Sequence, residues 1–484
     1  MNFTSQRHPK VFWYLCNIAF WDGYFNFALI TLLVVYLTQM FGFSDHKAYA
    51  LYGIFLSISY TMPLLAGWVS DRLISGSKAI IYANIFIMIG CVMLALPHPH
   101  YVLFGALFLI AWGVGLIKAN SNGLLSKLYP HKSKAQEQGY TWLYAAMNVG
   151  AIAGPILLSW IASHYSWSLG FLVSGTFFAI SLVLYLTQYR FIREQERPHL
   201  QLAWDISVIW QAVLMLVGTV VLIVVLALLV IIPVLFNVFV ALIIALAVYA
   251  FYTEWRKAPK TSWRPLLFLL MLYVFMMMFF ITEFQVGGAL AMFATRQIGT
   301  LHLGSFSIPA QSTAALLPLF VALGAFVVNP LMNKVQADHT AFRLMFRVFI
   351  GLLLAALAFL LFFDSASSSR EIDMGLMIGS LVLGYLLLGV AEILIAPTAL
   401  AATGHMIDKS RQSTFMGVYY LFAALAGYLA GKVSSIGQID PSMVTDRVML
   451  GLIYSKIFML LAIGMLGVCL IAGLILLGMR LLQR

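Results

Sequence analysis

Long apolar segments separated by short polar ones run through the whole chain. A transmembrane helix needs about 20 mostly apolar residues to cross the hydrocarbon core of a bilayer. The pattern predicts fourteen such helices, at about 12–40, 48–70, 79–97, 101–126, 139–162, 167–189, 206–229, 231–253, 265–294, 308–333, 341–363, 374–405, 412–436 and 449–479. Polar stretches at 190–205 and 254–264 separate the seventh and eighth helices from six helices on either side.

This six, two, six arrangement predicts an all-α polytopic membrane protein in three parts. We expect an N-terminal six-helix bundle (1–189), an inserted helix pair with cytoplasmic linkers (190–264) and a C-terminal six-helix bundle (265–484). The composition agrees, because 62% of the residues are hydrophobic and only 9% are charged, whereas a soluble domain has about 25% charged residues. Soluble, disordered, nucleic-acid-binding and disulfide-stapled proteins are excluded.

The positions of the basic residues predict the orientation. If the N-terminus lies in the cytoplasm, 21 of the 28 Lys and Arg residues fall in cytoplasmic segments and 6 in external ones. This bias is the positive-inside pattern of membrane proteins. It predicts that both termini are cytoplasmic, and it explains the net charge of +11 without a nucleic-acid partner.

Four formally charged residues lie within the predicted helices: Asp22, Lys118, Glu283 and Glu392. An ionisable group at the centre of a membrane helix costs about 2.5–3.5 kcal/mol on insertion scales. We therefore expect these groups to face a polar cavity or one another. They could line a path for substrate and ions, or they could form structural ion pairs between helices. Two six-helix halves with such groups are typical of a secondary transporter.

The loop after the second helix carries a recognisable motif. It reads GWVSDRLISGSK, and its pattern G-x-x-x-D-R-x-x-x-G-x-K resembles the signature of the major facilitator superfamily at this loop. The motif residues are Gly67, Asp71, Arg72, Gly76 and Lys78. Asp71 and Arg72 could satisfy each other and cap neighbouring helix ends. The alternative is a basic turn without that role.

Four further stretches resemble the proton-dependent oligopeptide transporter (POT/PTR) family of that superfamily. They are GVGLIKANSNGLLSKLY, WLYAAMNVGAIAGP, AEILIAPTALAATGHM and FMGVYYLFAALAGYLAG, which begin at Gly113, Trp142, Ala391 and Phe415. The resemblance implies uptake of di- and tripeptides by alternating access, driven by a proton gradient, in the bacterial inner membrane. We expect no cofactor, and we expect a monomer whose partners are the peptide, the proton and the lipid bilayer.

The first helix differs from the family pattern. The family carries E-x-x-E-R-F-x-Y-Y, whereas here Asn17, Phe20 and Trp21 replace the two acids and the arginine. Glu283 lies one residue and Asp22 two residues from a family acid position, and each step along a helix turns the side chain by about 100°. We consider both as proton-coupling candidates, with structural pairing or a water-facing helix end as the alternative.

The resemblance also implies a substrate pocket. Glu392 is suited to the ammonium group of a peptide, because a carboxylate offers several lone pairs to a compact cation. Lys118 is suited to the peptide carboxylate or to pairing with a titrating acid, so it is also a proton-coupling candidate. The other positions that match the family pocket are Tyr24, Tyr60, Tyr144, Asn148 and Tyr419. Their alternative role is hydrogen bonding between packed helices.

Other motifs limit the remaining functions. The G-x-x-x-G pairs Gly150/Gly154 and Gly427/Gly431 predict close helix packing. No spacing suggests a metal site, a nucleotide site or covalent catalysis, so an enzyme is not expected.

Two other functions stay open. One is a facilitator, or a differently coupled transporter, of another small zwitterionic or amphipathic solute, which the missing first-helix acids favour. The other is a non-transporting nutrient receptor on a transporter fold, for which we would expect an added signalling domain.

Overall fold

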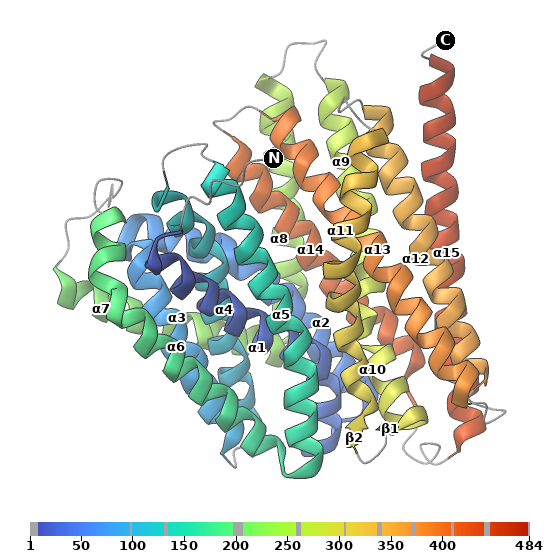
Figure 1. Cartoon of the computed structure of the whole chain (residues 1–484), viewed down its shortest axis with the longest axis horizontal. Coiled ribbons are helices and arrows are strands. Elements are labelled where there is room, and N and C mark those ends of the chain that lie inside the picture. Colours follow the sequence, from blue (N-terminus) through green and yellow to red (C-terminus); the bar gives the residue numbers. More distant parts are fainter. Residues whose placement is uncertain are drawn as a thin grey trace. The chain divides into compact units, whose positions relative to one another are not determined.

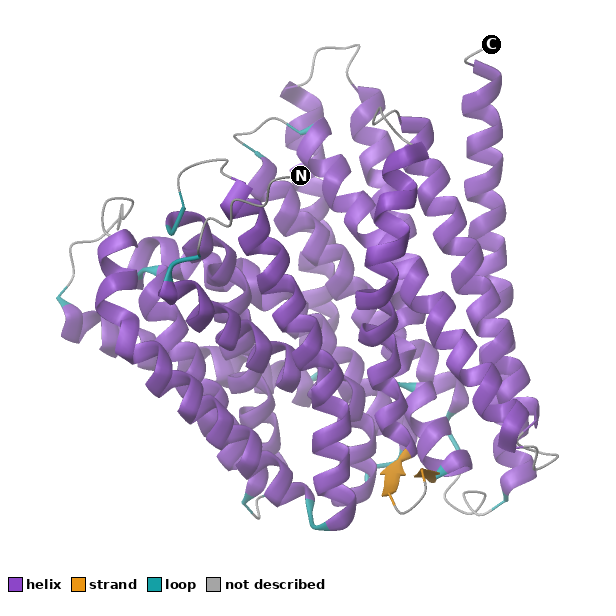
Figure 2. Ribbon diagram, viewed as in Figure 1, coloured by secondary structure: helices purple, strands orange, loops and turns teal. Residues whose placement is uncertain are grey.

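The computed structural model describes residues 8–96, 99–129, 134–196, 207–257, 263–303, 306–335, 341–368, 374–407, 411–439 and 446–482. Nearly all of this part of the chain is helical (Figures 1 and 2). Fourteen helices in these ranges are long and apolar enough to cross a membrane. The predicted all-α class and the predicted number of spans are therefore confirmed.

The long helices follow one another along the chain in the predicted order. They are α1 (Lys10–Phe41), α2 (Asp45–Val69), α3 (Gly76–Ala95), α4 (His100–Lys127), α5 (Lys134–His164), α6 (Trp167–Glu196), α7 (Val208–Ile231), α8 (Pro233–Lys257), α9 (Trp263–Glu283), α11 (Leu316–Val335), α12 (Ala341–Ser368), α13 (Met374–Met406), α14 (Gln412–Ser434) and α15 (Arg447–Leu482). The short elements are η1 (Ser70–Ile74), η3 (Phe284–Val286), α10 (Ala289–Phe293), η4 (Ala294–Ile298), β1 (Thr300–Leu303), β2 (Phe306–Pro309), η5 (Ala310–Ala315) and η6 (Ser435–Gly437).

The predicted helix over 265–294 is interrupted in the structure. The α-helical hydrogen bonding of α9 ends at Glu283, and the short elements η3, α10 and η4 follow. A Cβ atom added at Gly287 would collide with the backbone oxygen of Ile30, so only glycine allows the chain to pass α1 there. The antiparallel hairpin β1–β2, which pairs Thr300 with Pro309, is a feature that the hydrophobic pattern did not predict.

The contacts divide the chain into two compact units. The first unit is Met1–Leu29 with Ile58–Asn237, and the second is Ile30–Ser57 with Val238–Arg484. Each of the helices α1 and α2 thus contributes one part to each unit. In the second unit α12 packs on both α13 and α15 (Figure 1). The predicted division into two bundles and an inserted pair stays a prediction, because contacts alone do not define which parts act together.

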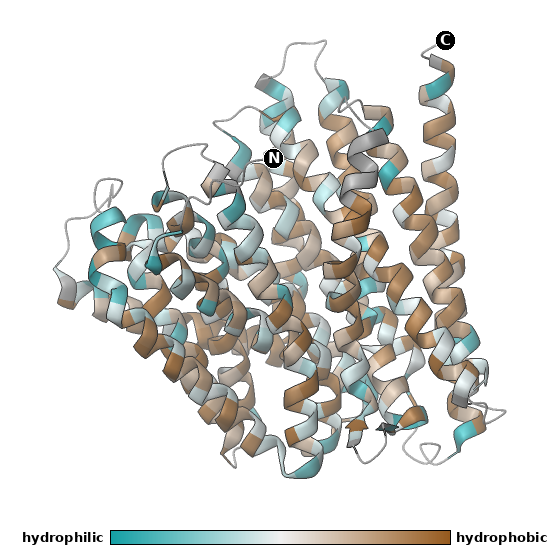
Figure 3. Ribbon diagram, viewed as in Figure 1, coloured by the Kyte–Doolittle hydropathy of each residue, from teal (hydrophilic) through white to brown (hydrophobic). Residues whose placement is uncertain are grey.

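Apolar side chains also cover outward-facing helix surfaces. Examples with more than half of their surface exposed are Val217 and Val221 on α7 and Leu470 and Leu474 on α15. Figure 3 shows α15 as hydrophobic along most of its length, with hydrophilic residues near its ends. Large exposed apolar surfaces are unfavourable in water, and helices satisfy their own backbone groups in lipid. The chain is a multi-pass membrane protein.

Candidate functional site

The first unit brings Asp22 of α1 and Lys118 of α4 together. Asp22 is 3% exposed, and its Oδ1 atom has no hydrogen-bond partner. The two opposite charges attract each other, yet none of the ion pairs found among the described residues joins them. The Nζ atom of Lys118 lies 5.5 Å from the ring centroid of Tyr60 on α2. Lys118 is therefore held by a ring and a nearby carboxylate without a direct ion pair.

Close packing of α1 on α5 positions Asp22. A Cβ atom on Gly150 would collide with the backbone oxygen of Phe20, and one on Gly154 with that of Tyr24. These collisions mean that only glycine allows the two backbones to approach so closely. The predicted packing role of this G-x-x-x-G pair is confirmed.

The second G-x-x-x-G pair has the same role in the second unit. A Cβ atom on Gly427 would lie 2.6 Å from the Cβ atom of Leu56, and one on Gly431 would lie 2.6 Å from the backbone oxygen of Tyr49. Both contacts join α14 to the first part of α2. The prediction for this pair is also confirmed.

The first-helix positions that lack the acids form an aromatic and polar cluster. The Trp21 ring stacks on Phe177 of α6 with 4.3 Å between the ring centroids, and it contacts Phe20 edge-on. The Nε1 atom of Trp21 and the Oδ1 atom of Asn17 are both buried without a hydrogen-bond partner. Unpaired buried polar atoms are unusual, and here they lie on α1 close in sequence to Asp22.

The other predicted pocket residues of the first unit differ in exposure. Tyr24 is fully buried, and its hydroxyl shares a hydrogen bond of 3.2 Å with Ser174 of α6. Asn148 is buried and donates from Nδ2 to the backbone oxygen of Tyr144 at 2.9 Å, whereas the Tyr144 side chain is about half exposed. In this conformation Tyr24 and Asn148 make helix contacts, and their roles toward a substrate stay predictions.

The second unit brings two acids together. Glu283, at the end of α9, and Glu392, on α13, are close enough for their like charges to act on each other. The Oε2 atom of Glu283 is buried without a hydrogen-bond partner. Like charges in a low-dielectric interior repel, and a bound proton or cationic group relieves that repulsion. Within the described ranges no group of three or more His, Cys, Asp or Glu could hold a metal ion.

Gln285 fixes the end of α9, and it is not among the residues predicted from the sequence. It is fully buried, donates from Nε2 to the backbone oxygen of Ala430 at 3.3 Å, and accepts from the Ser434 hydroxyl at 2.7 Å. These bonds tie the segment after Glu283 to α14. The signal in the sequence was a single amide in an apolar run, and its partners lie about 145 residues away.

Tyr419 belongs to an aromatic cluster between α9 and α14. Its ring centroid lies 6.1 Å from that of Tyr273 and 5.5 Å from that of Tyr420. Tyr273 in turn donates to the backbone oxygen of Phe415 at 3.0 Å. Tyr419 is buried, so in this conformation it packs between helices, and a contact with substrate stays a prediction.

Glu196 holds the turn that precedes α3. Its Oε1 atom accepts from the Gly76 backbone N–H at 2.8 Å, and Oε2 accepts from that of Ser77 at 3.1 Å. Lys127 at the end of α4 forms an ion pair with it at 3.2 Å. A carboxylate at a helix N-terminus satisfies unpaired N–H groups and the helix dipole. The role of Glu196 could not be predicted from the sequence, because Glu196 lies about 120 residues from the two N–H groups and 69 residues from Lys127.

Asp71 and Arg72 do not form the mutual pair that the motif suggested. Both are exposed, and no ion pair among the described residues joins them. Arg72 instead lies over the Trp68 ring, 5.2 Å from its centroid. Lys78 donates to the Oε1 atom of Gln211 on α7 at 2.5 Å. The capping role predicted for the motif is performed at α3 by a different carboxylate.

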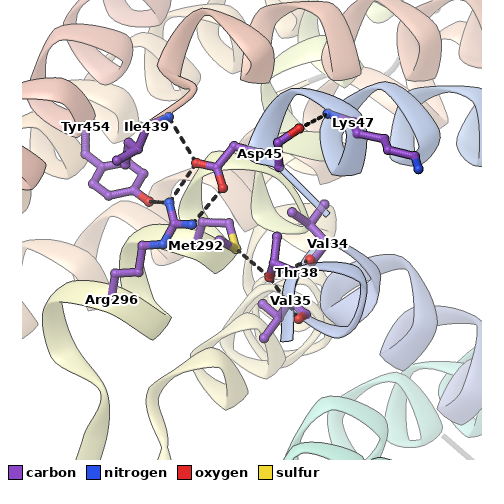
Figure 4. A network of polar contacts seen from close by, with 10 residues as sticks. Val34, Val35, Thr38, Asp45, Lys47, Met292, Arg296, Ile439 and Tyr454 are labelled. Carbon is purple, nitrogen blue, oxygen red and sulfur yellow. Dashed lines mark hydrogen bonds and ion pairs between the residues drawn. The ribbon is translucent and has the colours of Figure 1, made fainter. Parts of the chain in front are cut away.

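A buried polar network lies at the start of α2 within the second unit (Figure 4). Asp45 is 4% exposed and accepts two hydrogen bonds of 2.7 Å from Arg296. It also accepts from the Ile439 backbone N–H at 3.1 Å, and Arg296 donates to the Tyr454 hydroxyl at 3.2 Å. The network ties α2 to η4, to the segment after α14 and to α15. No local sequence signal joins these partners.

The chain is similar in sequence to proteins named as peptide permeases. The family model described as PTR2, POT family, matches residues 77–444. The dipeptide and tripeptide permease A of Serratia proteamaculans (strain 568) is 25% identical over 466 residues, which cover 96% of this chain and 90% of that protein. The dipeptide and tripeptide permease B of Photorhabdus luminescens is 26% identical over 457 residues, which cover 93% and 92%.

Solved structures share the fold. A structure described as "Structural insights into substrate recognition in proton dependent oligopeptide transporters" has a TM-score of 0.80 at 21% identity and covers 97% of this chain and 98% of that chain. A POT family transporter in complex with 5-aminolevulinic acid has a TM-score of 0.76 at 21% identity, with the same coverage. The predicted major facilitator architecture is confirmed by these similarities.

Proposed function

Because the chain belongs to the POT family, we propose that it takes up di- and tripeptides together with protons by alternating access. Membership of this family makes it a secondary transporter and not an enzyme. The observation that carries the proposal is that each unit holds two charged side chains in its helical interior. They are Asp22 with Lys118 in the first unit and Glu283 with Glu392 in the second.

The charges of the two units match the two ends of a peptide. Lys118, which carries a compact cation with three donors, binds the C-terminal carboxylate. Glu392, whose neighbour Glu283 is a second acid, binds the N-terminal ammonium. Tyr60 beside Lys118 gives an apolar wall that tolerates different side chains. This assignment favours a zwitterion over a simple acid or amine as the substrate.

The protonation state of Asp22 controls whether Lys118 is available to the substrate. An ionised Asp22 attracts the Lys118 ammonium and so competes with the substrate carboxylate for it. A proton on Asp22 removes that competition and frees Lys118 for the peptide. Glu283 is the corresponding group beside Glu392, because a proton on Glu283 relieves the repulsion between the two acids and leaves Glu392 ionised for the ammonium group. The protein works in the inner membrane, as expected for a bacterial member of the family.

Chemically blocked peptides test this assignment. Purified protein in proteoliposomes is given labelled Ala-Ala, with excess unlabelled Ala-Ala, N-acetyl-Ala-Ala or Ala-Ala-amide as competitor. We expect only unblocked Ala-Ala to compete strongly, because each blocked form lacks one of the two end charges. Equal competition by all three would contradict the roles of Lys118 and Glu392, and the absence of any Ala-Ala uptake would contradict the peptide substrate.

A facilitator of another small zwitterionic solute is the second candidate. The observation that favours it is the first-helix cluster, where Asn17, Phe20 and Trp21 leave no acid except Asp22. Such a protein would equilibrate its substrate across the membrane without concentrating it. Counterflow that proceeds normally in vesicles without any proton gradient, together with no accumulation when a gradient is imposed, would favour this function.

A further inference from the structure

The second unit has a groove between α8, α9 and α14. Its volume is about 610 Å³, within the range of about 300–1,000 Å³ that is usual for small-molecule sites. Phe422 of α14 lies at its floor, since it is buried, whereas Val248 of α8 and Leu267 of α9 are exposed along its sides. The groove is apolar and lies on a surface where the helices expose apolar residues, so its natural occupant is a hydrocarbon chain.

Aromatic residues gather at one end of the groove. They are Tyr252 and Trp255 near the end of α8 and Trp263 at the start of α9. Trp and Tyr are enriched where membrane helices reach the headgroup region. The distribution of basic residues along the chain predicts that this end faces the cytoplasm. The groove therefore runs from the hydrocarbon region to the inner headgroup level.

Positive charge lies beside this aromatic end. Arg256 lies in the last turn of α8 and Arg264 in the first turn of α9, and both are exposed. The Arg256 guanidinium lies 6.0 Å from the ring centroid of Tyr252, which itself lines the groove. Arg264 directly follows Trp263, which also lines the groove, so both cations are placed at its aromatic end.

Glu254, which precedes Arg256 by two residues, does not cancel this charge. Glu254 forms an ion pair of 3.0 Å with Arg411 at the start of α14, and Arg411 also donates to the Thr253 hydroxyl at 2.9 Å. These contacts hold α8 against α14, and the Arg411 guanidinium neutralises the Glu254 carboxylate. The groove thus has an apolar body and a cationic end, which is the complement of an anionic phospholipid.

We propose that this groove binds one anionic phospholipid of the cytoplasmic leaflet. An acyl chain lies between α8 and α9, and the phosphate lies beside Arg256 and Arg264. The lipid completes the packing of α8 on the second unit, where protein contacts leave the groove open. This gives the second helix of the inserted pair a function that is separate from peptide binding.

Lipid binding by the full-length purified protein tests the proposal. Native mass spectrometry follows a titration with palmitoyl-oleoyl-phosphatidylglycerol or with phosphatidylcholine of the same chains. We expect phosphatidylglycerol to bind more tightly, and we expect the double variant Arg256→Gln/Arg264→Gln to weaken phosphatidylglycerol binding by about fivefold for each charge removed. The control Arg480→Gln, an exposed charge in the last turn of α15, should leave the affinity unchanged.

A second pair of variants tests the groove itself. Val248→Trp places a large ring over the groove and should lower the binding of both lipids. Val238→Trp lies on the same helix, with 59% of its surface exposed against 61% for Val248, but it does not line the groove, so it should have no effect. Equal binding of the two lipids, or equal effects of each variant and its control, would overturn the proposal.

Discussion

The four charged side chains within the helices differ in their surroundings. Lys118 has the Tyr60 ring and the opposite charge of Asp22 beside it, whereas Glu392 has the like charge of Glu283. A cation without a direct ion pair can exchange its carboxylate neighbour for that of a substrate. A carboxylate beside a second acid gains from binding an ammonium group. The two surroundings therefore suit the two ends of a peptide.

Removing the charge of either Lys118 or Glu392 should strongly reduce transport. We expect Lys118→Ala and Glu392→Gln each to reduce dipeptide uptake by at least about tenfold, because losing a charge-assisted hydrogen bond costs about 1.5–3 kcal/mol. Uptake in proteoliposomes and thermal unfolding of the purified variants check this.

Lys118→Ala leaves Asp22 buried beside no cation, so the variant could simply fold poorly. Asp22→Asn/Lys118→Ala removes that problem and should fold normally but still not transport. Normal dipeptide uptake by a folded Lys118→Ala or Asp22→Asn/Lys118→Ala variant would refute the assignment of Lys118 to the peptide carboxylate.

The charged residues could be predicted from the sequence, whereas several of their neighbours could not. A charge in an apolar run is recognisable because the bilayer makes it costly. Glu196 and Gln285 are equally buried, but their roles depend on partners that lie 69 to 149 residues away. Only the folded chain brings those partners together.

At the scale of helices, the contact of α1 with α5 is decisive for the first unit. We expect Gly150→Ala to lower the stability by about 1–3 kcal/mol, because the new methyl group would overpack the contact with Phe20. The matched control is Gly218→Ala on α7, where nothing lies within 4 Å of an added Cβ atom. Thermal unfolding in detergent checks both, and equal melting temperatures would contradict the packing role.

The carboxylate that holds the start of α3 gives a second prediction. Glu196→Gln keeps the size of the side chain but removes its charge beside Lys127 and two N–H groups. We expect a loss of about 1–3 kcal/mol in unfolding free energy. Glu194→Gln, an exposed residue on the same helix, should have almost no effect. A similar loss of unfolding free energy in both variants would show that the charge of Glu196 does not stabilise the start of α3.

The helices could be predicted but their interruptions could not. Runs of apolar residues identify the spans because the bilayer requires a fixed length. The break after Glu283 depends on the passage of Gly287 close to Ile30, which is a tertiary contact. The hairpin β1–β2 lies in a short stretch between spans, where hydrophobic periodicity gives little information.

At the scale of the whole molecule, the second unit depends on a polar network that spans distant parts of the chain. Arg296→Gln leaves the Asp45 carboxylate buried without its cation. Breaking such a pair costs about 3–5 kcal/mol, so we expect a clearly lower melting temperature. Asp45→Asn/Arg296→Gln removes both charges and should be more stable than Arg296→Gln alone. If the double variant is the less stable of the two, the pairing account is wrong.

Proton-driven accumulation of a dipeptide tests the central claim most directly. Labelled Ala-Ala is measured inside proteoliposomes with an inside-alkaline pH gradient and again after a protonophore has removed it. The account predicts that the unmodified protein accumulates Ala-Ala above the external concentration only with the gradient. For Glu283→Gln it predicts that Ala-Ala equilibrates across the membrane without accumulating. Equal final levels with and without the gradient, or no uptake of any di- or tripeptide, would contradict it.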